Sequence, residues 1–487
     1  MTDHLVYVIS DLHLGGKPGD EHGDRGFAMC TQGAKLADFI GCLAEKPAGA
    51  PLLELVIAGD FLDFLAEEPP EGSGRWLSWQ PDPDQAKIVF HRIVERNADV
   101  FRALSKFHQA GHRLTLLLGN HDLELCYPAI QRELENVLSA PGANRIRFIY
   151  DGQSYQVGDT IIEHGNRYDA FNIVDHDGLR RMRSLQSRHE LMPPTWRYEP
   201  PPGSRLVAEI VNPIKNEFPF IDLLKPQGAA AVPILLALKP QVRTQLAKLA
   251  ALALQKWRRH CDETGIPRHV GDAGGAPCVP PDHPEDEGLH WALDHAFHHE
   301  KQSRSGFLSH FKISNLLKNG GHEIAVMEGA VSLFHLLTGP TSATTEEREN
   351  RHNALLDAVR AWADRRTFDL EYEQPSERHY LAAARRLIGS GFRNVVFGHT
   401  HLARNIDLAN GKKYINSGTW ADLIRLPDGV FDDDANSARQ SLNEFVEAIR
   451  NKNYDKLIFR RPTFARIEQQ AQETVKASVE EFQDQAV

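Results

Sequence analysis

The sequence predicts an α/β protein with a large, mostly helical segment inserted into its core. Three apolar runs rich in Val, Ile and Leu, over residues 5–10, 52–60 and 113–122, have the length and composition of buried strands. Amphipathic helical patterns over about 34–46 and 84–110 separate these runs. Strands that alternate with helices are typical of a layered α/β core. The alternation stops in the middle of the chain and resumes towards its end, which indicates the insertion.

The elements follow one another in a regular order. Apolar residues over about 84–110 recur with a period close to 3.6, and a glycine follows them, so we expect one long helix there. Residues 145–165 contain short strands separated by Asp-Gly and Gly-Asp turn signals, and His164 lies at the end of the last strand. A helix over about 376–388 precedes an apolar run that ends at His399. The late strands therefore complete the core.

The inserted segment has a different character. A Pro-rich stretch near its start excludes regular helix, whereas residues 241–260 and 345–366 show helical patterns on either side of a Gly- and Pro-rich loop over 261–288. The chain after residue 435 is polar and helical in pattern. We therefore expect a first core part, an inserted helical cap, a last core part and a C-terminal helical extension, over residues 1–171, 172–372, 373–434 and 435–487.

Composition sets limits on the class of protein. The chain has 487 residues, 41% of them hydrophobic, and a net charge of −11, which differs from a strongly cationic nucleic-acid binder. Residues 171–260 nevertheless hold 14 Lys and Arg against 7 Asp and Glu. The five cysteines form no C-x-x-C pair, which argues against a disulfide framework. No secretory leader and no uninterrupted membrane-spanning run is evident, so we expect a cytoplasmic protein.

Five short strings carry metal-binding side chains, and most of them follow an apolar run. The strings are "SDLHLG", "GDFLDF", "GNHD", "EHG" and "GHTH". Their seven candidate ligands are Asp11, His13, Asp60, Asn120, His164, His399 and His401. Seven ligands are too many for one ordinary ion and suit two ions that share a bridging carboxylate, a standard arrangement for cleaving phosphate esters. Carboxylate and imidazole ligands favour Mn²⁺, with Fe and Zn²⁺ as alternatives. His121, next to Asn120, is placed to protonate a leaving oxygen.

The order D-x-H, G-D-x-x-D, G-N-H-D, H-G and G-H-x-H resembles the calcineurin-like metallophosphoesterase superfamily, over residues of about 5–170 and 376–420. The resemblance implies a four-layer α/β/β/α sandwich. It implies that one metal is held by Asp11, His13 and His401, that the other is held by Asn120, His164 and His399, and that Asp60 bridges them. It assigns the acid role to His121, an orienting role to Asp122, and a supporting role beside a ligand to Asp63. The long gap between His164 and His399 departs from compact members of the superfamily.

The resemblance implies hydrolysis of an anionic phosphodiester, pyrophosphate or phosphomonoester by a hydroxide that bridges the metals. The strings "SDLHLG" and "EHGNRYD" are similar to those of UDP-diacylglucosamine pyrophosphohydrolases, which suggests a nucleotide- or lipid-linked substrate. That group has Arg in place of His121 and a much shorter insert. The apolar stretch over residues 218–238 can contact a membrane surface or form the core of the cap.

Other functions are compatible with the same strings. A nuclease is one, because "DLHLG" and "GNHD" also resemble repair exonucleases of the superfamily and the basic segment can follow a nucleic-acid strand. A protein phosphatase and a metal-free scaffold are two more. Arg180, Arg181 and Arg183 either clamp a phosphate or form a solvated helix face. Asp169, Asn172, Asp175 and His176 follow "EHG" and can line the same rim, but nothing in the pattern fixes them there. The oligomeric state is not indicated.

Overall fold

A computed structural model describes the two ends of the chain and little of its middle. The described residues are 2–17, 19, 26–47, 51–69, 74–139, 146–169, 171–188, 190, 197–215, 221–224, 356, 372–373, 378–451, 453, 455–470 and 475–483. The chain divides into two compact units: Met1–Pro219, Leu370–Asp422 and Phe459–Val487 form the first, and Phe220–Asp369 and Leu423–Ile458 form the second. The helices expected over 241–260 and 345–366, the loop over 261–288 and the apolar stretch after 224 lie outside the described residues, apart from residue 356.

The first sheet has six strands in the order β13-β12-β1-β2-β3-β4. Four of these strands are parallel neighbours and come from the N-terminal part of the chain: β1 (Thr2–Ile9), β2 (Leu52–Ala58), β3 (Arg113–Leu117) and β4 (Ile146–Ile149). The three predicted apolar runs therefore form strands β1, β2 and β3. Because these strands are parallel, their carboxyl ends lie at the same edge of the sheet.

The other two strands of this sheet correct the expectation of a helical C-terminal extension. Residues 435–487 begin with helix α15 (Ala435–Arg450), but β12 (Thr463–Gln470) and β13 (Lys476–Glu481) follow, and β12 pairs antiparallel with β1. In β13 the buried side chains are Ala477 and Val479, which alternate with charged and polar residues. A period of two with only small and medium apolar residues gives an edge strand a weak signal.

The second sheet has five strands in the order β5-β6-β7-β9-β8. Its strands are β5 (Tyr155–Val157), β6 (Thr160–Ile162), β7 (Asn394–Phe397), β8 (Arg404–Leu408) and β9 (Lys412–Asn416). The neighbours β6 and β7 are parallel although more than two hundred residues separate them along the chain. Their carboxyl ends, which precede His164 and His399, therefore meet. Both sheets are mixed, and the fold is α/β.

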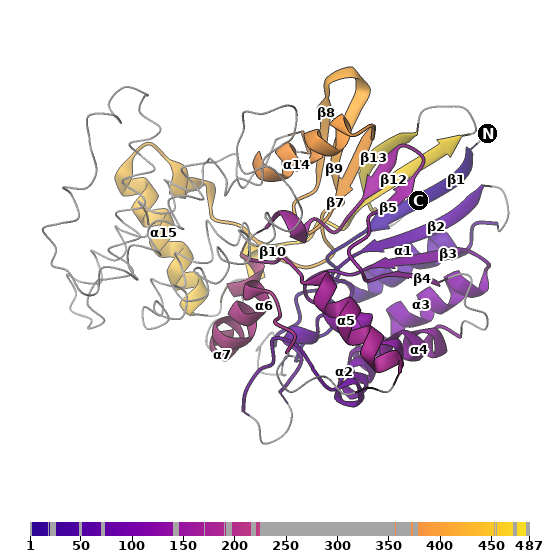
Figure 1. Ribbon diagram of the computed structural model, residues 1–487. Helices are drawn as coiled ribbons and strands as arrows, with labels where there is room; N and C mark the ends of the chain where they lie inside the picture. The colour runs from indigo at the N-terminus through magenta and orange to yellow at the C-terminus, as the bar shows by residue number, and fades with distance from the viewer. Residues whose placement is uncertain are drawn as a thin grey trace, which may run out of the picture. The chain divides into compact units, whose positions relative to one another are not determined.

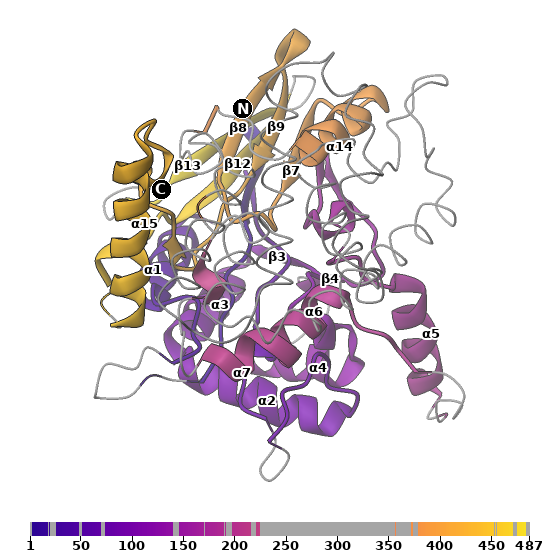
Figure 2. The ribbon, with the colours of Figure 1, turned by 90° about the vertical axis from the view of Figure 1, so that its left-hand side faces the viewer.

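Three clusters of buried side chains show how the layers of the first unit pack. Odd-numbered residues of β1, such as Tyr7, face helices, whereas even-numbered residues such as Val8 pack with Ile162 and Ile415 of the second sheet. The other face of the second sheet, with Val395, packs against Tyr380 of helix α14 (Arg378–Gly389). The layers are therefore helices, sheet, sheet and helix. Figure 1 shows α2 (Pro83–Arg96), α3 (Ala98–Gln109) and α4 (Pro128–Val137) gathered on one side of the first sheet, and Figure 2 shows α14 beside β7, away from them.

The helices agree with the sequence in most places and differ in one. Helix α1 (Gly33–Ala44) and helix α14 (Arg378–Gly389) lie where they were predicted. The single helix predicted over 84–110 is wrong, because α2 (Pro83–Arg96) and α3 (Ala98–Gln109) are separate. Asn97 interrupts them with φ −120° and ψ 32°, and its side-chain Nδ2 donates to the Ile93 carbonyl at 2.9 Å. An asparagine that bonds a carbonyl of the preceding turn favours a helix end.

Further helices and strands lie within the described residues. They are α4 (Pro128–Val137), α5 (His176–Ser187), α6 (Pro202–Leu206), a π-helix (Val207–Val211), α7 (Asn212–Lys215), β10 (Leu423–Ile424) and β11 (Ile458–Phe459). Helices α5, α6 and α7 belong to the first unit, although residues after 172 were expected in the cap. A search of the described helices finds none with the length and apolar character needed to cross a membrane.

A buried carboxyl group away from the strand ends gives the fold a measurable pH dependence. Burial raises the pKa of Glu124 from 4.5 to about 8, although its Oε1 accepts a hydrogen bond from the Gln80 amide at 2.8 Å. Between pH 4.5 and about 8 the folded chain keeps a proton on Glu124 that the unfolded chain releases. The contribution of Glu124 to the free energy of unfolding is therefore complete below pH 4.5 and is lost as the pH rises through the folded pKa. Each pH unit over which the two states differ by one proton changes stability by about 1.4 kcal/mol.

We therefore expect Glu124→Gln to melt at a higher temperature than wild type at pH 9, because glutamine keeps the acceptor and never ionises. The difference should shrink or reverse at pH 5, where the wild-type carboxyl is neutral in the folded chain. Thermal melts of both proteins across this pH range measure the effect. A constant difference between the two melting temperatures would show that Glu124 does not ionise on unfolding.

Candidate metal centre

The predicted ligands all lie just beyond the carboxyl ends of five strands. Asp11 follows β1, Asp60 follows β2 and Asn120 follows β3, whereas His164 follows β6 and His399 follows β7. The parallel strands of each sheet bring their ends together, and the packing of one sheet on the other brings the two sets together. Every predicted ligand belongs to the first unit. The structure thus gathers side chains that are up to 390 positions apart in the sequence.

The backbone at the ligands is strained. Five ligands have a positive φ: Asp11 (53°), His13 (44°), Asp60 (51°), His399 (68°) and His401 (62°). Only two other non-glycine residues among those described, Ser139 and Asn410, share this conformation. A non-glycine residue in this region costs about 1–3 kcal/mol and persists only where the surrounding structure imposes it. Such strain concentrates at functional sites, and no sequence pattern had indicated it here.

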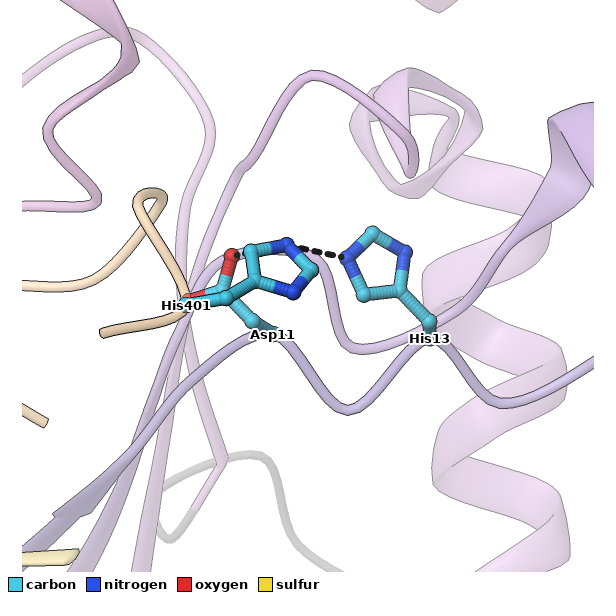
Figure 3. A group of neighbouring side chains, drawn as sticks. All are labelled: Asp11, His13 and His401. Atoms are coloured by element: carbon cyan, nitrogen blue, oxygen red, sulfur yellow. Dashed lines mark hydrogen bonds and ion pairs between the residues drawn. The ribbon is translucent and has the colours of Figure 1, made fainter. Parts of the chain in front are cut away.

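The first metal group consists of Asp11, His13 and His401, whose ligand atoms lie within 4.8 Å of one another (Figure 3). The Nε2 atoms of the two histidines are 3.2 Å apart, and His401 Nε2 is 3.4 Å from Asp11 Oδ1. Asp11 Oδ2 accepts hydrogen bonds from the Ser10 hydroxyl and the His399 amide. Asp11 Oδ1 is buried and has no hydrogen-bond donor within the described part of the chain. A cation is the partner that such an oxygen fits.

The second metal group, as the sequence predicts it, consists of Asn120, His164 and His399. His164 Nε2 lies 3.3 Å from Asn120 Oδ1, and a ligand atom of His399 lies within 4.8 Å of those of His164 and Asp60. The other ring nitrogen of His164, Nδ1, lies 2.8 Å from the Ala58 carbonyl, to which it donates. That bond leaves Nε2 as the ring nitrogen that would bind an ion after losing its proton.

Asp60 lies between the two groups. Its Oδ2 is 3.2 Å from His164 Nε2 of the second group and 3.8 Å from His13 Nε2 of the first. Burial raises the pKa of Asp60, but His164 and His121 outweigh burial and hold it well below its usual range. Burial likewise lowers the pKa of His164, but Asp60 reverses the effect and raises it to about 9. The ionised Asp60 carboxylate therefore lies close to imidazoles of both groups.

His121 lies at the rim of the centre, with 13% of its side chain exposed. Its partner is Asp63, which corrects the prediction that Asp122 orients it. His121 Nδ1 lies 3.1 Å from Asp63 Oδ1, while the other oxygen of Asp63 lies 3.3 Å from His13 Nδ1. Asp63 thus contacts His13, the predicted ligand beside it, and it also contacts His121, the residue that Asp122 was predicted to orient. Both histidines keep Nε2 directed away from Asp63, and their rings are 4.6 Å apart.

Asp122 holds the backbone of two strand-end loops. Its Oδ2 accepts a hydrogen bond from the Phe61 amide at 2.8 Å, and its Oδ1 accepts one from the Gly119 amide at 2.7 Å. Burial and the neighbouring Asp60 raise the pKa of Asp122 to about 7. The side chain therefore joins the loop that carries Asp60 to the loop that carries Asn120. The orienting contact predicted between Asp122 and His121 is replaced by the contact of His121 Nδ1 with Asp63.

Two residues that the sequence had left unplaced join the centre. Asp169 Oδ2 lies 3.1 Å from His399 Nε2, and Asn172 Oδ1 accepts from Asn120 Nδ2 at 3.3 Å. Two of the three arginines of α5 have protein partners, which favours a structural role for them over a phosphate clamp. Arg183 donates to the Cys126 carbonyl at 2.7 Å, and Arg180 pairs with Asp177. Only the proximity of Asp169 and Asn172 to "EHG" had hinted at their position.

The fold and the site together define an α/β protein with a buried centre of histidine, aspartate and asparagine that could hold metal ions. The donor set contains imidazole, carboxylate and amide oxygen and no thiolate, which suits Mn²⁺, Fe or Zn²⁺. Comparison of the chain with models of protein families, with curated proteins and with solved structures finds no match. What the chain does has to be inferred from the centre itself.

Proposed function

We propose that this chain is a phosphoesterase that uses two divalent metal ions, with Mn²⁺ as the first choice, and that it belongs to the calcineurin-like metallophosphoesterase superfamily. One observation carries the proposal: the Asp60 carboxylate lies within 3.2 Å and 3.8 Å of imidazoles from two different metal groups. A carboxylate shared in this way is the arrangement that two ions acting together on one substrate require.

The fold and the order of the ligands support the same proposal. Helices, sheet, sheet and helix are stacked in the order that the superfamily's four-layer sandwich has. The five ligand strings occur in the superfamily's order. The proximity of Asp11, His13 and His401, and that of Asp60, His164 and His399, supports the grouping that the resemblance implies. The groupings depend on side chains from both sheets, so chance similarity of one short string does not produce them.

Each residue of the centre has a role in this proposal. Asp11, His13 and His401 would hold one ion, Asn120, His164 and His399 would hold the other, and Asp60 would contribute to both sites. When bound, the two ions neutralise the phosphate oxygens and lower the pKa of a water molecule. His121 donates a proton to the leaving oxygen, and Asp63 keeps its ring in place through Nδ1. A phosphoester substrate carries negative charge, which bound divalent ions would attract.

The choice among phosphoesters is open to a direct experiment. The purified chain is incubated with Mn²⁺ and a panel of phosphomonoesters, phosphodiesters, pyrophosphate-linked nucleotides, single- and double-stranded DNA, RNA and a phosphopeptide. We expect hydrolysis of a small phosphodiester or pyrophosphate and its loss in Asp60→Asn. Cleavage of DNA or RNA alone would favour a nuclease, and cleavage of the phosphopeptide alone would favour a protein phosphatase. No hydrolysis of any member by a chain loaded with Mn²⁺ would contradict the proposal.

A further inference from the structure

Asp169 and Asn172 form a chain of hydrogen bonds that joins two ligands of the second metal group. Asp169 lies three residues before Asn172, on the segment that leads from His164 towards α5. Asp169 Oδ2 faces His399 Nε2 at 3.1 Å and accepts from Asn172 Nδ2 at 2.6 Å. Asn172 Oδ1 in turn accepts from Asn120 Nδ2 at 3.3 Å. The chain runs from His399 to Asn120 without a gap.

The carboxylate end of this chain determines the form of His399. An ionised carboxylate has only acceptor oxygens, so His399 Nε2 must carry the proton in this contact. The neutral ring then keeps its lone pair on Nδ1, the nitrogen left to bind an ion. A metal-binding histidine whose second nitrogen donates to a carboxylate has both its tautomer and its ring orientation set by that bond.

The same carboxylate determines the orientation of two amides. Because Asp169 only accepts, Asn172 must turn its NH₂ towards Asp169 and its oxygen towards Asn120. Asn120 must then turn its own NH₂ towards Asn172. Its Oδ1 is left facing His164 Nε2 at 3.3 Å, which is where a metal ligand has to point. With the amide reversed, Asn120 would present its NH₂ group to a cation.

We propose that Asp169 and Asn172 are positioning residues for the second metal group alone: Asp169 sets the tautomer of His399 and, through Asn172, the amide orientation of Asn120. The inference rests on the proposed two-ion centre. The first group has its own supports, since Asp63 contacts His13 and Ser10 bonds Asp11. Loss of Asp169 therefore removes support from two of the seven ligands, and loss of Asn172 removes it from one.

The test is a titration of Mn²⁺ into the metal-stripped full chain with no substrate present. The electron paramagnetic resonance signal of free Mn²⁺ monitors how much of the metal is bound. Outer partners of metal ligands typically contribute about 10–100-fold to affinity. We expect Asp169→Ala to weaken one of two Mn²⁺ sites by roughly 100-fold and Asn172→Ala to weaken the same site by roughly 10-fold. Asp169→Asn keeps an acceptor oxygen for one donor, so its loss should lie between these values and should remain measurable if the alanine variant fails to fold.

Assignment of the weakened site comes from combined variants. Asp169→Ala with His401→Ala should bind no Mn²⁺ tightly, whereas Asp169→Ala with His164→Ala should bind as His164→Ala does. Asp177→Ala, an exposed aspartate of α5, is the matched control and should bind two ions as wild type does. Unchanged affinity in folded Asp169→Asn and Asn172→Ala, or equal losses at both sites, would overturn the inference.

This titration separates the inference from the proposed function. A chain that shows the expected pattern of Mn²⁺ affinities and hydrolyses no phosphoester would leave the inference standing and refute the function. A chain that hydrolyses a phosphoester while the variants bind Mn²⁺ like wild type would do the reverse. A wild-type chain that binds fewer than two Mn²⁺ ions would refute both.

Discussion

Replacing Asp60 by alanine is expected to remove tight Mn²⁺ binding from both metal groups at once. Asp60 Oδ2 lies near imidazoles of both groups, at 3.2 Å from His164 Nε2 and 3.8 Å from His13 Nε2. Each group would keep its other ligands, but their cations would face one another without the shared negative charge. Metal analysis after dialysis should therefore fall from about two ions per chain to fewer than one.

Asp60 also has a structural contact, so a second variant is needed. Its Oδ1 accepts the His121 amide at 2.8 Å, and Asp60→Asn retains that acceptor while it loses the charge. Asp60→Asn should melt close to wild type in the metal-free state and still fail to retain two ions. Asp99→Ala, an exposed aspartate of α3, controls for the loss of a negative charge and should bind metal normally. Retention of one full ion by Asp60→Asn would show that the carboxylate serves only one group.

Replacing His121 by alanine is expected to leave both ions in place and to slow hydrolysis by about 10²–10⁴-fold, the usual contribution of a general acid. His121 lies at the rim, and its Nδ1 contacts Asp63, so its loss leaves all seven ligands with their own contacts. Mn²⁺ content and kcat on the best substrate of the panel measure the two effects separately. Substrates with a leaving group of low pKa need no proton, so they should lose much less rate.

Asp63 extends this test to the orientation of His121. If Asp63 acts on catalysis through His121, adding Asp63→Asn to His121→Ala should slow hydrolysis by little more than His121→Ala alone. Because Asp63 also contacts His13, the Mn²⁺ affinity of the first group has to be measured in the same variants. Loss of bound Mn²⁺ from His121→Ala itself would contradict the division of roles, since it would make His121 a ligand.

The ligands of the centre could be predicted because each belongs to a short string with a buried strand before it. A strand end is a fixed place in a parallel sheet, so "GD", "GN" and "GH" after apolar runs indicate both the chemistry and the location. The partner of His121 could not be predicted in this way. Asp63 and Asp122 are both within a few residues of a ligand, and only the geometry shows that backbone amides occupy Asp122.

The parts of the fold that the sequence did not predict have weak local sequence patterns. Their structure depends on contacts with residues far away in the sequence. Strands β12 and β13 carry many charged residues, and their pairing with β1 is what makes them strands. At the break, the Asn97 side chain bonds the Ile93 carbonyl, and the apolar period continues through it. The positive φ at Asp11 and at the other strained ligands is imposed by the packing around them, which no short pattern records.

Anomalous diffraction at the manganese edge, from crystals of the chain grown with Mn²⁺, tests the two-ion centre most directly. We expect two peaks about 3.5–4 Å apart, the usual separation in two-metal sites. One peak should lie beside Asp11, His13 and His401, the other beside Asn120, His164 and His399, with Asp60 between them. A single peak, or two peaks that do not share Asp60, would contradict a dinuclear centre in this chain.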